Sequence, residues 1–357
     1  MPLPRWPVAT LCLAGCLLAG ALGASAATDD GPPPWAYGFK TPAGETLPPA
    51  PPAKVAAPDP THYGLPGTDL KFTRAELSEI FNPADFYPED HATPPAIVAH
   101  GKAPDIWACA RCHYANGKGR PENAGLAGLP IEYFIAELQS FRRGERTSSD
   151  ARKPNTKMMS DYARGMSDEE IRAAAGYFGA MKWTPWIRVV ETARVPRTEV
   201  SAGMYLQIPN GGDEPLGDRI IEVPENPDAV EITRSPRVGF IAYVPVGSVQ
   251  RGAVLVTTGR EGRTMACATC HGPALNGGMI SGFGAVPGIA GRSPSYLMRQ
   301  LFDLKTGHRK GPRTILMQPV VANLSTDDMR DIVAYLSSRP VSASIASSAR
   351  PPASTAP

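Results

Sequence analysis

Two short motifs in this chain combine cysteine and histidine at a spacing suited to holding an iron porphyrin. The pattern Cys-x-x-Cys-His occurs at Cys109–His113 and again at Cys267–His271. The two thiols of such a motif can add to the vinyl groups of a haem as thioethers, and the histidine can bind the iron from the proximal side. Two copies in similar surroundings predict two covalently bound c-type haems. The predicted thioether residues are Cys109, Cys112, Cys267 and Cys270, and the predicted proximal iron ligands are His113 and His271.

The remaining cysteines limit the alternatives. The sequence holds six cysteines, and the two outside the motifs, Cys12 and Cys16, lie in a segment that we expect to be removed. A mature chain then has no cysteine left for a disulfide, an iron–sulfur cluster or a thiolate iron ligand. The alternative is one four-thiolate zinc site built from both Cys-x-x-Cys pairs. That site requires pairs 158 positions apart to meet and leaves both histidines without a role, so we favour haem.

Residues 1–26 have the pattern of a secretory signal peptide. Arg5 precedes the apolar run Val8–Leu22, and Ala24-Ser25-Ala26 fits the small-x-small rule for cleavage after its last alanine. We therefore expect export to the periplasm, where haem is attached to such motifs. An alternative is a lipoprotein signal with a membrane anchor, because Leu13-Ala14-Gly15-Cys16 resembles a lipobox. An uncleaved anchor is disfavoured because the apolar run is shorter than the ~20 residues that a membrane span needs.

The charge balance says little about partners. The formal net charge is +2, and it falls to +1 without residues 1–26, whose one charged side chain is Arg5. A nearly neutral chain gives no reason to expect nucleic-acid binding. Docking of a protein partner would depend on local patches of charge.

The two motifs stand at the head of two copies of one sequence unit. The separation of 158 positions between Cys109 and Cys267 recurs between Ser167 and Ser325. Residues between these anchors match at a separation of 163 positions instead. The matched pairs are Tyr133 and Tyr296, Leu138 and Leu301, and Gly144-x-Arg146 and Gly307-x-Arg309. The second copy thus has five extra residues before its middle helix and five fewer after it, which indicates a fixed haem pocket with variable loops.

A methionine follows each motif at the same distance and is the predicted distal iron ligand. Met159 and Met317 each lie 46 positions after the histidine of their own motif. A thioether sulfur opposite a histidine raises the reduction potential of the iron. Met158 is the alternative in the first unit, and only the repeat favours its neighbour. Met166 aligns with Leu324 and is predicted to lie in the core.

Amphipathic helices must position these ligands, and apolar residues at helical spacing predict where they lie. The expected ranges are 74–81, 130–141, a helix that begins at Ser167, 248–256, 294–304 and a helix that begins at Ser325. Hydroxyl side chains ahead of acidic residues predict three of the N-caps. These caps are Thr73, Ser167 and Ser325.

Three further regions differ in composition from the helical units. Short β-prone runs at 187–190, 219–223 and 238–244 alternate with Pro, Gly and Asn turns, so we predict a small β-rich insertion over residues 185–246. Residues 27–67 are rich in proline, which removes a hydrogen-bond donor at each position, and we expect an extended or disordered linker. The Ser-, Ala- and Pro-rich residues 340–357 are expected to form a disordered tail.

These residues resemble class I cytochrome c domains, and their tandem arrangement resembles a dihaem cytochrome c of the cytochrome c4 type. The resemblance covers about residues 95–183 and 247–338. It rests on the haem motif, the Tyr-x-x-x-x-Leu middle helix that ends in Gly-x-Arg, the methionine and the capped last helix. It implies a mainly α fold with two cytochrome c domains, which we place at residues 68–184 and 247–339, low-spin iron and one-electron transfer.

The resemblance also implies a backbone carbonyl that holds the ring of each proximal histidine. In the family a proline supplies this carbonyl, and Pro287 matches that position in the second unit. Ala124 falls there in the first unit, and alanine has a carbonyl too.

These features favour a periplasmic electron carrier that passes single electrons through two His/Met-ligated haems. The protein partners would be redox proteins such as a membrane oxidoreductase, a dehydrogenase or a terminal oxidase, and no catalytic residue is needed. One alternative is a dihaem enzyme of the peroxidase kind, which requires an open iron site that two matched methionines oppose. Another is the electron-transfer subunit of a periplasmic dehydrogenase complex. A thiosulfate dehydrogenase with a cysteine-ligated haem is disfavoured because no spare cysteine remains.

Overall fold

The computed structural model describes Met1 and residues 31–42, 44–45 and 59–341 of the 357-residue chain. Residues 2–26 of the predicted signal peptide, its cleavage site, the lipobox and nearly all of the predicted C-terminal tail lie outside these residues. None of the helices in the described part of the chain has the length and apolar character of a membrane span.

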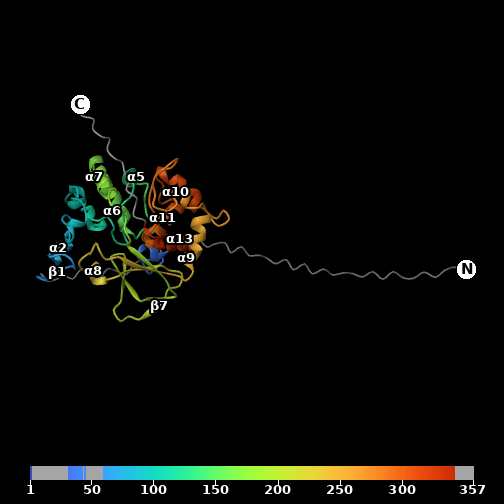
Figure 1. The fold of residues 1–357 in the computed structure, drawn as a ribbon, viewed down its shortest axis with the longest axis horizontal. Helices are drawn as coiled ribbons and strands as arrows, with labels where there is room; N and C mark the ends of the chain where they lie inside the picture. Colours follow the sequence, from blue (N-terminus) through green and yellow to red (C-terminus); the bar gives the residue numbers. More distant parts are fainter. Residues whose placement is uncertain (2–30, 43, 46–58, 342–357) are drawn as a thin grey trace, which may run out of the picture. The chain divides into compact units, whose positions relative to one another are not determined.

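The first haem unit is a group of helices around the first Cys-x-x-Cys-His motif (Figure 1). Its helices are α3 (Ala96–Ala99), α4 (Cys109–His113), α5 (Ile131–Arg142), α6 (Pro154–Gly165) and α7 (Asp168–Gly179). The predicted cap of α7 is confirmed, because the Ser167 hydroxyl accepts from the Glu170 N–H and the Glu170 carboxylate accepts from the Ser167 N–H. The helix α6 was not predicted, because its sequence has few apolar residues at helical spacing.

The second haem unit repeats this plan with different connections. Its elements are α9 (Ser248–Thr258), α10 (Ala268–His271), β10 (Gly278–Ile280), β11 (Gly284–Val286), α11 (Pro294–Lys305), η2 (Pro312–Met317), α12 (Gln318–Val321) and α13 (Thr326–Ser338). The hairpin β10–β11 occupies the loop in which the sequence repeat places five extra residues. A capping box of Ser325 and Asp328 begins α13, so this predicted N-cap is also confirmed.

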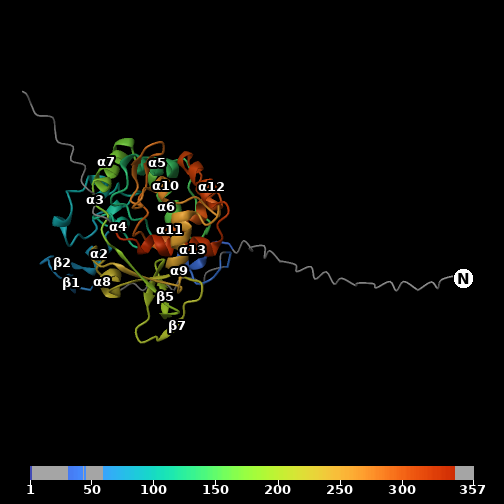
Figure 2. The same cartoon turned by 45° about the vertical axis from the view of Figure 1, so that its right-hand side comes forward.

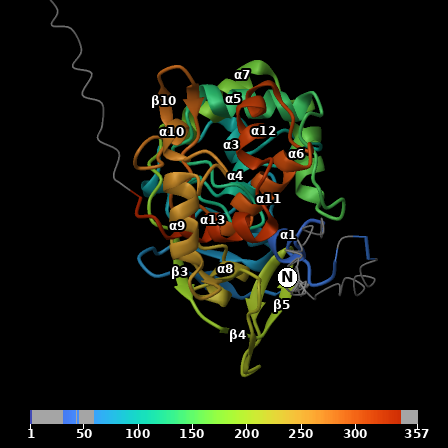
Figure 3. The same ribbon diagram turned by 90° about the vertical axis from the view of Figure 1, so that its right-hand side faces the viewer.

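The region between the haem units is rich in strands, as predicted. It contains β3 (Ile187–Glu191), β4 (Arg194–Pro196), β5 (Thr198–Ser201), β6 (Met204–Gln207), β7 (Asp213–Pro215), β8 (Ile221–Pro224), α8 (Pro227–Glu231) and β9 (Phe240–Val244). The central sheet has the order β3–β9–β8, with β9 parallel to β3 and antiparallel to β8. Figures 2 and 3 show these strands gathered on one side of the haem-unit helices.

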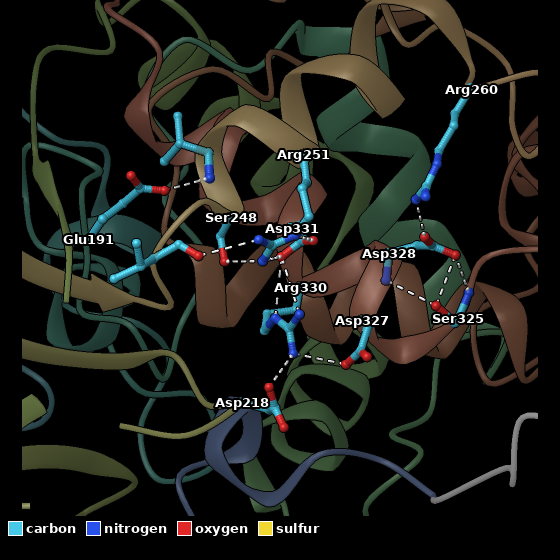
Figure 4. Close-up of polar contacts among 12 residues, drawn as sticks. Glu191, Asp218, Ser248, Arg251, Arg260, Ser325, Asp327, Asp328, Arg330 and Asp331 are labelled. Atoms are coloured by element: carbon cyan, nitrogen blue, oxygen red, sulfur yellow. Dashed lines mark hydrogen bonds and ion pairs between the residues drawn. The ribbon is translucent and has the colours of Figure 1, made fainter. Parts of the chain in front are cut away.

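The strand region shares its core with the second haem unit. Ala242 and Val244 of β9 belong to the same buried apolar cluster as Val333 of α13. Figure 4 shows Arg330 of α13 contacting Asp218 of the inserted region at 3.2 Å, next to the ion pair of Arg251 and Asp331 at 2.6 Å within the second unit. The insertion is therefore packed onto the second unit and does not form a separate lobe.

The prediction of an extended or disordered linker is wrong for residues 34–37. These residues form the short helix α1 (Pro34–Tyr37), whose Trp35 and Tyr37 side chains are buried. The Tyr37 hydroxyl donates to Asp303 of α11 at 3.1 Å. A proline is tolerated in the first turn of a helix, and burial of two aromatic rings stabilises a contact that composition alone does not reveal.

The prediction of a helix over residues 74–81 is too long. The helix α2 (Arg74–Ser78) begins at the predicted capping box of Thr73 and Glu76 but ends three residues early. The carbonyl of Ile80 instead accepts from the Ala108 N–H at 3.0 Å. Two further strands, β1 (His62–Gly64) and β2 (Lys71–Thr73), pair antiparallel ahead of α2.

Two candidate haem sites and the wall between them

The first candidate haem site is built on α4, which carries the first motif. His113 is buried, and its Nδ1 lies 2.8 Å from the carbonyl oxygen of Ala124. A carbonyl in this position accepts from Nδ1–H and so leaves Nε2 free to bind a metal. Burial lowers the pKa of His113 and keeps the ring neutral, as an iron ligand must be.

The second candidate site has the same geometry. His271 is buried on α10, and its Nδ1 lies 2.8 Å from the carbonyl oxygen of Pro287. The expected histidine–carbonyl contact is therefore confirmed in both units. The contact in the first unit shows that the carbonyl, and not the proline ring, is the part that matters for orienting the imidazole.

No disulfide joins the four described cysteines, and each pair lines the cavity of its own histidine. The two Cys-x-x-Cys pairs line different cavities, which contradicts the alternative of one four-thiolate zinc site. No group of three or more His, Cys, Asp or Glu suited to a metal ion occurs among the described residues.

Each cavity is large and mostly apolar. The first has a volume of about 1290 Å³ and is lined by aromatic and aliphatic side chains such as Phe134 and Phe178. The second has a volume of about 1360 Å³ and is lined by leucines such as Leu297 and Leu336. An apolar cavity with two thiols and one neutral imidazole at its wall matches the donor set of a covalently held haem. The residues present therefore fit this group.

Methionine side chains line both cavities, and they come from different kinds of helix in the two units. Met158 and Met159 of α6 both line the first cavity, and Met317 at the end of η2 lines the second. Met159 also packs against the apolar core of the first unit. Met166 is buried, as predicted for a core residue.

The two cavities meet at a common wall that sequence reasoning missed. Tyr133 and Glu137 of α5 and Tyr296 and Gln300 of α11 line both cavities. These four residues are two matched pairs of the sequence repeat, separated by 163 positions. The two middle helices thus both contribute to the wall, with glutamate at this position in the first unit and glutamine at the matched position in the second.

Two arginines clamp the single carboxylate of this wall. Glu137 lies 2.5 Å from Arg146 and 2.9 Å from Arg309. Arg146 also donates to Gln300 at 2.7 Å, and Arg309 donates to Tyr133 at 2.8 Å. Both arginines come from the repeated Gly-x-Arg motif, which was the sequence signal that could have pointed to this cluster.

The charges of the wall do not cancel. Burial alone would raise the pKa of Glu137, but Arg309 and Arg146 lower it below its ordinary value, so the carboxylate is ionised. Glu137 carries one negative charge and the two arginines carry two positive charges, so the three side chains together have a net charge of +1. The Nε of Arg309 is buried and has no hydrogen-bond partner among the described residues. The wall can therefore accept a further anionic group.

Comparison with known proteins agrees with this geometry. The family model for cytochrome c matches residues 100–182 and 249–340. A protein of Stutzerimonas stutzeri named thiosulfate dehydrogenase electron acceptor is 39% identical over 240 residues, which cover 66% of this chain and 80% of that protein. The chain belongs to the cytochrome c family.

Other relatives of this cytochrome c are dihaem proteins of the c4 type. Cytochrome c4 of Stutzerimonas stutzeri is 27% identical over 149 residues, which cover 41% of this chain and 67% of that protein. Among solved structures, the thiosulfate dehydrogenase TsdBA from Marichromatium purpuratum has 26% identity and a TM-score of 0.43, covering 70% of this chain and 40% of that chain. Reduced cytochrome c4 from Pseudomonas stutzeri has 20% identity and a TM-score of 0.41, and the match covers 65% of this chain and 93% of that chain.

This cytochrome c therefore holds two covalently bound c-type haems and transfers single electrons between redox proteins, as predicted. Its relatives are electron carriers and electron-accepting proteins, so the peroxidase alternative gains no support. The haems supply the redox chemistry, and the chain supplies their ligands and surroundings.

Proposed function

We propose that this dihaem cytochrome accepts electrons from a thiosulfate-oxidising dehydrogenase and passes them to a second redox partner. The support is the 39% identity that spans 80% of a protein named for this role. The cysteine count agrees, because the four described cysteines belong to the haem motifs and leave no described thiol as an iron ligand of a dehydrogenase site. Electron acceptance is therefore the role that fits both the relative and the residues.

We further propose how the chain holds its haems. Cys109 and Cys112 form the thioethers of the first haem, and Cys267 and Cys270 form those of the second. His113 with Met159, and His271 with Met317, are the axial ligand pairs. When bound, each haem supplies a reversible one-electron centre. A histidine whose Nδ1–H is held by a carbonyl stays in one orientation, and a methionine sulfur favours the reduced iron.

The shared wall is the observation that carries a two-haem relay. Since Tyr133 and Tyr296 line both cavities, the two redox centres are separated by side chains and not by bulk water. Arg146 and Arg309 supply donors for the carboxylates that a haem carries, and the unpartnered Nε of Arg309 is one such donor. The wall therefore serves as the electron path within the molecule.

We infer that the protein is exported to the periplasm and that its signal peptide is cleaved after Ala26. We also infer a first cytochrome c domain at residues 68–184, a β-rich insertion at residues 185–246 and a second cytochrome c domain at residues 247–339. Intact mass of the native protein tests the cleavage. A mass that includes a lipid on Cys16 would replace this processing with the lipoprotein alternative.

A reconstituted electron-transfer assay tests the proposed partner. Purified holo-protein is mixed in a stopped-flow instrument with a purified thiosulfate dehydrogenase and thiosulfate, and the reduced-haem absorption band is followed. We expect rapid reduction of both haems only when enzyme and thiosulfate are both present. An unrelated His/Met cytochrome c serves as the matched acceptor. Reduction that is no faster than that of the unrelated cytochrome would overturn the proposed partner and leave the dihaem carrier role intact.

A further inference from the structure

A third cavity lies beside the first haem motif and shares no lining residue with either haem cavity. Its volume is about 850 Å³. Its walls come from three parts of the chain: the segment around Leu77 and Asp85, the motif residues Ala110 and Arg111 with the following Tyr114, and the inserted region at Arg234. A polar cavity at such a junction has the character of a binding site.

Two arginines give this cavity its charge. Neither Arg111 nor Arg234 forms an ion pair with a carboxylate in the described part of the chain. Each guanidinium group donates one hydrogen bond to a backbone carbonyl. Arg111 donates to the carbonyl of Leu77 at 2.8 Å, and Arg234 donates to the carbonyl of Arg111. Several N–H groups of the pair are therefore left for a ligand.

The acidic residues of the cavity are already engaged. Asp85 lies 2.9 Å from His91, and Asp90 accepts two hydrogen bonds from Arg237 at 2.6 and 2.7 Å. The described charged groups that face the cavity thus leave the two free guanidinium groups uncompensated. An anion would relieve this imbalance.

Tyr114 supplies an independent sign of a ligand. It is 5% exposed, and its hydroxyl is buried without a hydrogen-bond partner among the described residues. Its backbone has a φ of 59°, in the left-handed region that bulky residues avoid. The matched residue of the second unit is Gly272, with a φ of 79°, for which this conformation costs nothing. A strained tyrosine at a position where the second unit has glycine points to a function for its side chain.

We propose that this cavity binds a small divalent oxyanion of the sulfate type between Arg111 and Arg234, with the Tyr114 hydroxyl as a third donor. Guanidinium groups present parallel N–H donors that match oxyanion geometry, and charge-assisted hydrogen bonds of this kind are strong. The segment that carries Arg111 lies inside the haem motif. Because an added negative charge beside a haem favours ferric iron, the bound anion lowers the reduction potential of the first haem, and the oxidised protein binds the anion more tightly.

Titration calorimetry of the purified holo-protein tests the site. Sodium sulfate, thiosulfate and phosphate are titrated separately at constant ionic strength against a chloride background. We expect one saturable site per chain for the divalent oxyanions. Arg234→Gln should weaken binding about ten-fold or more, because it removes a charge-assisted contact. Tyr114→Phe removes only the hydroxyl and should weaken binding several-fold. Arg188→Gln removes the same charge from an exposed side chain of β3 and should leave binding unchanged.

A redox titration with and without sulfate gives the second readout. The midpoint potential of one haem should fall in sulfate for the wild-type protein and for Arg188→Gln, and should stay constant for Arg234→Gln. If Arg234→Gln fails to fold, Tyr114→Phe still tests the site, because it removes only one hydroxyl and should weaken anion binding several-fold. Absence of saturable binding to the wild-type protein, or equal binding by Tyr114→Phe, Arg234→Gln and wild type, would overturn the site. Neither measurement uses the dehydrogenase, so this inference stands or fails apart from the proposed partner.

Discussion

The two haem units keep the same histidine–carbonyl geometry but differ in the charges and backbone around it. Both hold the proximal histidine with a carbonyl at 2.8 Å, and both begin their last helix at a serine capping box. They differ where Glu137 of the first unit is matched by Gln300 of the second, and where Tyr114 is matched by Gly272. The comparison indicates that a repeated unit retains what the iron requires and varies what distinguishes one haem from the other.

The elements that carry the two proposed distal methionines also differ. In the first unit α6 is a helix of 12 residues, whereas in the second unit Met317 ends the 3₁₀ helix η2 of 6 residues. Helix α6 also offers two neighbouring methionines to one cavity, and η2 offers one. The two units thus place the proposed ligand at the same distance along the chain, 46 positions after the motif histidine, but on different types of helix.

The largest expected effect comes from removing a distal methionine. Met159→Ala and Met317→Ala should each abolish half of the weak Met–iron absorption band of the oxidised protein and lower the potential of one haem. Optical spectra and a redox titration measure both changes. Met158→Ala is the matched control and should retain the full band. Loss of the band in that control, and not in Met159→Ala, would show that α6 does not follow the alignment of the two units.

Removal of the single wall carboxylate should have the next largest effect. Glu137→Ala removes the buried carboxylate that binds both Arg146 and Arg309, and breaking a buried ion pair from one side typically costs about 3–5 kcal/mol of folding stability. Urea unfolding of the holo-protein measures it.

The isosteric variant Glu137→Gln makes the two units alike at this position. It should raise the midpoint potentials, because a negative charge near both haems is lost, and Gln300→Glu should lower them. Unchanged potentials in both variants would mean that the wall does not distinguish the haems.

The pH dependence of stability should expose the link between the insertion and the second unit. Glu222 of β8 is buried against the Ser293 cap of α11, at 2.8 Å from its hydroxyl, whereas Pro130 holds the matched cap position of the first unit. Burial raises the pKa of Glu222 to about 7. Because the pKa is raised in the folded state, the stabilising contribution is complete below the unfolded pKa of ~4.3 and is lost as the pH rises towards 7.

The expected loss between pH 4.5 and pH 8 is roughly 3 kcal/mol at most, from 1.36 kcal/mol per unit of pKa shift. Urea unfolding across this range measures it, and Glu222→Gln should flatten the profile. An equally steep profile in that variant would assign the dependence to other groups.

A pair of glycine substitutions should give the smallest effects and opposite signs. A Cβ at Gly252 of α9 would lie 1.9 Å from the carbonyl oxygen of Asp331, so Gly252→Ala should destabilise the second unit by about 1–3 kcal/mol. A Cβ at Gly176 of α7 would meet nothing within 4 Å, so Gly176→Ala should stabilise the first unit by about 0.5–1 kcal/mol. Thermal unfolding of both variants measures the difference, and equal shifts would mean that the close α9–α13 contact has relaxed.

The features that could be predicted from the sequence each depend on residues that lie close together along the chain. The capping boxes of Ser167 and Ser325 each span four residues, and each haem motif spans five, so no tertiary contact is needed to recognise them. The predicted runs of strand at 187–190 and 238–244 likewise correspond to β3 and β9. Helix α1 was missed because only the burial of Tyr37 against α11 explains why a proline-rich segment folds.

The sequence by itself determined that this protein has two haem units of one plan, since attachment motifs, caps and matched methionines are patterns of nearby or evenly repeated residues. Only the tertiary structure decided that α5 and α11 form one wall between the cavities, and that Arg111 and Arg234 meet beside Tyr114. Those contacts join residues more than 100 positions apart, as in the bond from Arg146 to Gln300. No local pattern encodes them, because their energy arises from burial and charge that exist only once the chain is folded.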